Sequence, residues 1–204
     1  MTYPYYTGKR ETPIEKPQNH LPKPISHKLI EPKDYISTRE MVNAVNVALI
    51  MNQPLLLTGE PGSGKTQLAH RVAWELGLGD PLSFETKSTS TARDLFYVFN
   101  TLARFHAAEI RESLDETAFI TYQALGKAIL LANHPGDDKI KKVLPEDFVH
   151  NGPKRSVVLI DEIDKAPRDF PNDILNEIEQ MFFKIPELNN PEIKAPENMQ
   201  PIAI

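Results

Sequence analysis

Residues 59–66 read Gly-Glu-Pro-Gly-Ser-Gly-Lys-Thr and match the pattern G-x-x-x-x-G-K-[ST] in full. Its glycines let the backbone adopt positive φ and approach a ligand without a Cβ in the way. The N–H groups of such a loop point into one concavity, which favours anionic oxygens. Lys65 can reach the β- and γ-phosphates of a nucleotide, and Thr66 offers a hydroxyl to Mg²⁺. The loop therefore predicts a site for a polyphosphate and its metal ion.

Two carboxylates follow the most apolar run of the chain. Residues 157–160 are Val-Val-Leu-Ile, and Asp161 and Glu162 come directly after them. In a parallel sheet, ligands lie outside the carboxyl ends of the strands, so we expect Asp161 on the same rim as Thr66. Asp161 can then hold Mg²⁺, directly or through its water. Glu162 can accept a proton from, or orient, a water that attacks the γ-phosphorus.

The elements that must position these residues alternate between strand and helix patterns. A capping-box pattern at residues 37–40 precedes an apolar helical run that ends before Pro54. Loop 59–64 has an apolar strand pattern before it and a helix pattern after it, ending at Gly77. We expect four strands, near residues 54–58, 82–86, 156–161 and 200–204, and further helices at 90–111, 118–131 and 171–183. Such alternation is typical of an α/β fold with a parallel sheet flanked by helices.

Composition narrows the class of protein. The 204 residues contain no cysteine and carry a net charge of −5, which argues against disulfide frameworks, thiolate metal sites and a general affinity for nucleic acid. No apolar run reaches the ~20 residues that cross a bilayer, and the N-terminus lacks a signal-peptide pattern. We expect a cytoplasmic protein without a membrane partner. Residues 1–33 are proline-rich and aperiodic, so we expect an extended arm ahead of a core at 34–204.

With both motifs placed, the chain resembles AAA+ ATPases, and within them the MoxR-type branch, close to the dynein-related domains. The residues that carry this resemblance are 54–66 and the run Asp-Glu-Ile-Asp-Lys-Ala-Pro at 161–167. The resemblance spans roughly residues 35–204 and implies a P-loop NTPase core with ATP and Mg²⁺ as cofactors. It implies a homo-oligomeric ring, with ATP bound between neighbouring subunits. It also implies chaperone-like remodelling of protein clients, at times beside a von Willebrand type A domain protein.

The resemblance transfers roles to individual residues. Asp161 and Thr66 become metal ligands, and Glu162 and Lys65 the catalytic residues. Nucleotide binding is assigned to Gly59, Glu60, Pro61, Gly62, Ser63, Gly64, Lys65, Thr66 and Gln67. The family's sheet has five strands, and its sensor residue, arginine finger and helical lid follow the fourth. We therefore expect a chain that is truncated before those parts, in which turnover suffers more than binding.

Two alternatives stay open beside an ATP hydrolase. One is a nucleotide-binding module without turnover, and the other is a different phosphate-loop enzyme, such as a small-molecule kinase or a nucleic-acid translocase. At the rim, Glu85, Thr86 and Lys87 end the second strand, where one of them could relay a proton to the attacking water. Solvated strand-end residues are the favoured interpretation there. Lys165 is interpreted as a surface or subunit-contact residue.

Overall fold

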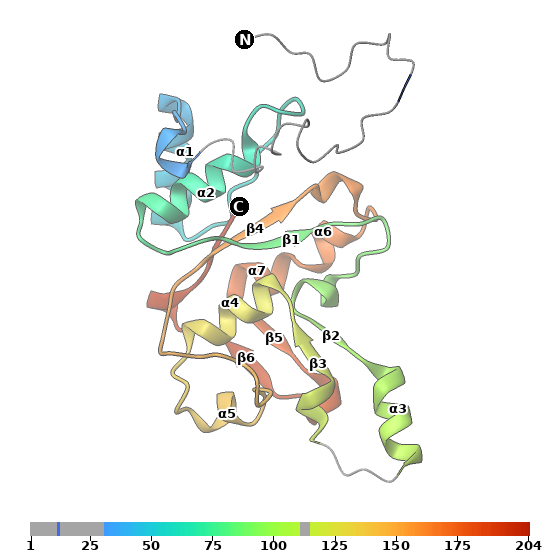
Figure 1. Ribbon diagram of the computed structural model, residues 1–204. Coiled ribbons are helices and arrows are strands. Elements are labelled where there is room, and N and C mark those ends of the chain that lie inside the picture. Colours follow the sequence, from blue (N-terminus) through green and yellow to red (C-terminus); the bar gives the residue numbers. More distant parts are fainter. Residues whose placement is uncertain (1–11, 13–30, 111–114) are drawn as a thin grey trace.

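The computed structural model describes Thr12, residues 31–110 and residues 115–204 (Figure 1). The predicted arm, residues 1–33, therefore lies almost wholly outside the described residues. The 3₁₀ turn η2 (Pro32–Asp34) contains the last two residues of that range and packs against α2 (Lys65–Glu75), where Arg71 donates to the carbonyl of Lys33 at 3.1 Å. No helix in these described ranges is long and apolar enough to cross a membrane.

A parallel sheet of three strands lies at the centre of the fold. Its strands are β1 (Leu82–Glu85), β4 (Val157–Asp161) and β7 (Ile202–Ala203), in the order β1-β4-β7. The α/β class and three of the four expected strands are confirmed. The fourth expected strand, 54–58, has no regular pairing and only runs beside β7, where the Leu55 amide donates to the Ala203 carbonyl at 2.9 Å. Leu56 is 71% exposed because this segment lies at the open edge of the sheet.

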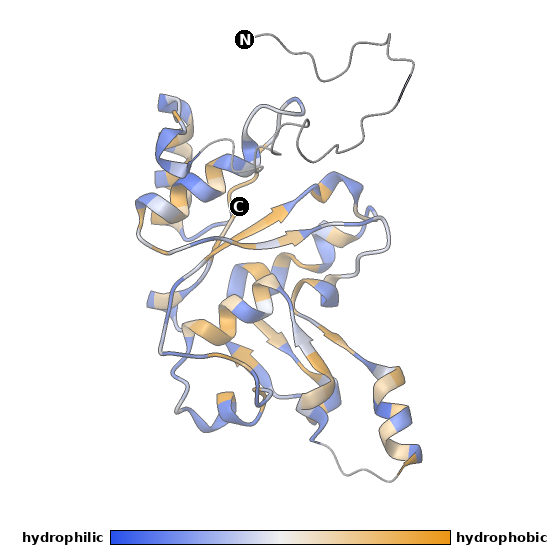
Figure 2. Cartoon of the chain, viewed as in Figure 1, coloured by the Kyte–Doolittle hydropathy of each residue, from blue (hydrophilic) through white to orange (hydrophobic). Residues whose placement is uncertain are grey.

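Alternating residues of β4 face two different apolar layers. Val157 and Leu159 pack with α2 and with α1 (Arg39–Met51), whereas Val158 packs on the opposite side. The helices on that side are α4 (Ala124–Ala132), α6 (Phe170–Asp173) and α7 (Leu175–Gln180). Figure 1 shows α1 and α2 above the sheet and α4, α6 and α7 below it, and Figure 2 shows β4 and α4 as strongly apolar. The sheet is thus covered on both faces, as parallel sheets are.

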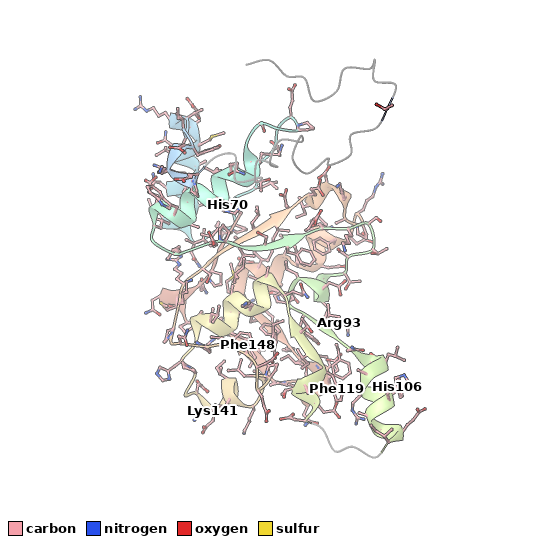
Figure 3. The ribbon with its side chains drawn as sticks, viewed as in Figure 1. His70, Arg93, His106, Phe119, Lys141 and Phe148 are labelled. Carbon is pink, nitrogen blue, oxygen red and sulfur yellow. The ribbon has the colours of Figure 1, made fainter. Side chains whose placement is uncertain are left out.

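The sequence analysis did not predict two small antiparallel sheets of two strands each. One pairs β2 (Tyr97–Phe99) with β3 (Ile120–Tyr122), and the other pairs β5 (Phe182–Lys184) with β6 (Glu192–Lys194). The helices predicted over 90–111 and 118–131 are therefore wrong in part: each range contains a 3₁₀ turn, a short strand and a shorter helix. The turns and the first helix are η3 (Ala92–Leu95), η4 (Glu116–Phe119) and α3 (Thr101–Glu109). Figure 3 shows His70 on one side of the sheet and Arg93 and Phe119 on the other.

The remaining elements are short. The helix predicted over 171–183 is two helices, α6 and α7, which Ile174 separates, and its last residues belong to β5. The other elements are α5 (Asp138–Lys141) and the 3₁₀ turns η5 (Ile163–Lys165), η6 (Pro186–Leu188) and η7 (Glu197–Met199). The parallel pairing of β1 and β4 brings the ends of both strands to one rim of the sheet, where the start of α2 also lies.

Candidate nucleotide site

The loop at residues 59–64 has the backbone that its glycines permit. Gly62 and Gly64 have φ of 78° and 85°, in the left-handed region, and Gly59 has φ of 148°. An ideal Cβ built on Gly64 would lie 3.1 Å from the Tyr35 ring, so this position is restricted by space as well as by conformation. Gly64 is the N-cap of α2, and the first amides of a helix lack partners within it. They are directed toward this loop, where the positive end of the helix also lies.

Lys65 folds back over the loop. Its Nζ donates to the carbonyl oxygens of Gly59 at 2.9 Å and Glu60 at 2.8 Å, and it lies 3.5 Å from Ser63 Oγ. The ammonium thus occupies the mouth of the loop, where three neutral oxygens surround it. Glu60, Pro61 and Ser63 are exposed, whereas residues 64–67 are half-buried. The loop is open to a ligand from solvent.

Thr66 and Asp161 meet although 95 positions separate them in the sequence. Thr66 Oγ1 donates to Asp161 Oδ2 at 2.8 Å, and the Glu162 amide donates to Asp161 Oδ1 at 2.9 Å. Both oxygens of the Asp161 carboxylate are therefore oriented by the protein. The meeting arises because β4 ends at the rim where α2 begins, as expected for a parallel sheet.

Glu162 lies in a strained turn beyond β4. Its φ of 56° is in the left-handed region, which is uncommon for a residue with a side chain and is found at functional sites. Lys165 Nζ lies 2.5 Å from Glu162 Oε2. This hydrogen bond is the largest cause of a raised pKa of the Lys165 ammonium, and the charges of Glu162, Glu85 and Asp164 add to it. The sequence interpretation of Lys165 as a surface residue missed this contact, which i,i+3 spacing could have indicated.

Thr86 differs from its neighbours on the rim. Glu85 and Lys87 are exposed, but Thr86 is 1% exposed and its amide donates to the Asp161 carbonyl at 3.0 Å. Among the described atoms, its buried Oγ1 finds no hydrogen-bond partner. The expectation of a solvated strand end is therefore wrong for Thr86. Buried hydroxyls are normally paired, so Thr86 is unusual among the residues of this rim, and the relay role stays a prediction.

The parallel sheet, the glycine-rich loop at the start of α2 and the carboxylate at the end of β4 define the core of a P-loop NTPase. Residues 54–203 match the model of the AAA domain, dynein-related subfamily. The match covers most of the chain, which therefore belongs to this family of ATP-binding AAA+ ATPases. No curated protein matches the chain significantly.

Proposed function

We propose that this chain binds MgATP at the rim formed by residues 59–67, Asp161 and Glu162, and that it hydrolyses the γ-phosphate. The observation that carries the proposal is the hydrogen bond from Thr66 to Asp161 at 2.8 Å. It places a hydroxyl and a carboxylate from distant parts of the chain at the end of a loop suited to phosphates. ATP, rather than another nucleotide, is proposed from the family.

The residues present fit a magnesium ion. A hydroxyl oxygen and a carboxylate oxygen are the hard donors that Mg²⁺ prefers, and a few protein ligands suffice because the ion keeps several waters. Thr66 and Asp161 would hold it, and when bound it neutralises charge on the phosphates. Their present hydrogen bond shows that the two oxygens already converge.

The other side chains bind and orient the substrate. Lys65 exchanges the carbonyls of Gly59 and Glu60 for phosphate oxygens, which are stronger partners for an ammonium because they are charged. The amides ahead of Lys65 bind the same phosphates and set their position. Glu162 orients the attacking water and accepts its proton. Because Asp161 fixes the amide of Glu162, the base begins from a defined backbone position.

The run at residues 161–167 supports a more specific function, because the residues after Asp161 and Glu162 resemble those of the MoxR-type branch. We propose that hydrolysis drives chaperone-like remodelling or assembly of protein clients by a homo-oligomeric ring. A von Willebrand type A domain protein is the kind of partner that this branch suggests. A chain that binds MgATP but shows no turnover would favour the binding-module alternative.

Calorimetry tests the proposed function. We expect the chain to bind MgATP more tightly than MgGTP, and Lys65→Ala to weaken MgATP binding by about 10- to 100-fold, since a charged hydrogen bond contributes about 1.5–3 kcal/mol. Lys141→Ala, which removes an exposed lysine of α5 away from the rim (Figure 3), is the matched control. At about 100 times the dissociation constant, MgATP should stabilise the fold by ~2.7 kcal/mol. A melting temperature that does not respond to nucleotide would refute the proposal.

A further inference from the structure

The turn after β4 brings a lysine onto the proposed base. Lys165 follows Glu162 by three residues, and its backbone amide donates to the Glu162 carbonyl at 2.9 Å. The left-handed backbone of Glu162 begins this turn, η5. As a result the Lys165 ammonium contacts Glu162 Oε2, and both side chains remain partly exposed at 55% and 39%.

A second carboxylate, that of Glu85, ends the neighbouring strand β1. Glu85 pairs with Asp161 in the register of β1 and β4, so the last residues of the two strands lie side by side. Glu85 also contributes its charge to Lys165. Lys165 therefore lies near acidic residues at the ends of two adjacent strands, and among the described residues its ion pair is with Glu162.

We infer that Lys165 is a positioning residue that holds the Glu162 carboxylate at the rim in one orientation. The inference rests on the proposed function, because it assigns Lys165 a role through the base. A glutamate side chain has several rotamers, and a base contributes to rate only when its carboxylate is aligned with the water. An exposed ion pair adds little to stability. The pair therefore acts by orienting Glu162. Its removal should lower turnover and leave the stability of the fold unchanged.

Steady-state hydrolysis by the full chain tests this role. Lys165→Met should lower kcat for MgATP about tenfold, with KM for MgATP and the melting temperature unchanged, because orientation and not binding is lost. Lys165→Arg should retain most of kcat. Lys184→Met is the matched control, since Lys184 forms a comparably exposed pair with Glu192 at 3.4 Å on the β5–β6 hairpin. An unchanged or increased kcat in Lys165→Met would overturn the inference.

A double variant separates this inference from the proposed function. If Lys165 acts through Glu162, adding Lys165→Met to Glu162→Gln should lower kcat no further; a further tenfold loss would overturn the inference. A Glu162→Gln variant with full turnover would instead overturn the proposed function.

Amine labelling followed by mass spectrometry tests the contact between Lys165 and Glu162 without the need for turnover. Glu162→Gln should speed the modification of Lys165 several-fold and leave Lys184 unchanged, and an equal rate at Lys165 in both proteins would contradict the contact.

Discussion

Asp161 is the residue on which the geometry of the site depends. One carboxylate oxygen accepts from Thr66 and the other from the Glu162 amide, so the metal position and the base share one anchor. An arrangement fixed before the ligand arrives needs less reorganisation during the reaction. Lys65 is the exception, because it must leave the carbonyls of Gly59 and Glu60 when phosphate binds.

The role of Glu162 is tested by its amide variant. Glu162→Gln keeps the size of the side chain but cannot accept a proton, so turnover should fall by about 10²–10⁴-fold while MgATP affinity is retained. Phosphate release and nucleotide binding are measured on the same preparation. Glu179→Gln, at an exposed position of α7, is the control. Hydrolysis at the original rate would show that Glu162 is not the base.

At the scale of elements, α4 packs closely on the turn that precedes β2. A Cβ added to Gly126 would lie 2.0 Å from the backbone oxygen of Phe96, and Gln123 at the start of α4 donates to that oxygen at 2.8 Å. Backbone cannot move aside as a flexible side chain can. The contact explains a glycine within the helix, where it otherwise costs stability.

Gly126→Ala should therefore destabilise the fold by about 1–3 kcal/mol or more, as overpacking does in other cores. Chemical denaturation measures this change in the free energy of unfolding. Lys127→Ala, at the exposed next position of α4, should change it by less than about 0.5 kcal/mol. Equal stabilities of the two variants would contradict the packing of α4 on Phe96.

The two-stranded sheet of β2 and β3 contains two tyrosines that should make the folding stability depend on pH in the alkaline range. Burial, and then Glu187, raises the pKa of the Tyr97 hydroxyl, which donates to Glu187 Oε2 at 2.8 Å. Burial also raises the pKa of Tyr122, which donates to the Val143 carbonyl at 2.8 Å. Above about pH 10 the unfolded chain releases these protons and the folded chain keeps them, so folding stability should fall as pH rises.

Each tyrosine should contribute a slope of about 1.4 kcal/mol per pH unit in that window. Tyr97→Phe and Tyr122→Phe should each remove one such contribution to the slope. Below pH 9, the change that each variant causes in the free energy of unfolding should not depend on pH. Denaturation curves between pH 8 and 11 give the slopes. If the free energy of unfolding has the same pH dependence in the wild type and both variants, these hydroxyls ionise as readily in the folded state as in the unfolded state, and the prediction is wrong.

The sequence predicts some elements far better than others. The strands at 82–86 and 156–161 and the helix after Gly64 are confirmed. The strand at 156–161 is a continuous apolar run bounded by turn residues, the helix has apolar residues at helical spacing, and residues 82–85 alternate between apolar and polar. Strands β2 and β3 have three residues each, too few to show the alternation of apolar and polar residues that marks a strand. Their pairing depends on contacts between distant residues, such as Tyr97 opposite Tyr122, which local patterns do not contain.

For the whole molecule, the rim could be predicted better than the body that supports it. The two motifs and the parallel sheet predict that Thr66 and Asp161 lie on one rim, and the hydrogen bond between them agrees. The burial of the Thr86 hydroxyl could not be foreseen, since it depends on how side chains pack beyond the strand ends. The contact of Lys165 with Glu162 had a local signal in its i,i+3 spacing, which the sequence interpretation did not use.

The most direct test of the central claim is the metal dependence of ATP binding in Asp161→Asn. If residues 59–67 and Asp161 form one site for MgATP, the wild type should bind ATP about 10-fold or more tightly with Mg²⁺ than with a chelator, since metal ligation at such a site resembles a charged contact. Asp161→Asn should lose most of that difference while its binding of metal-free ATP remains close to that of the wild type. An undiminished magnesium effect in Asp161→Asn would contradict the account.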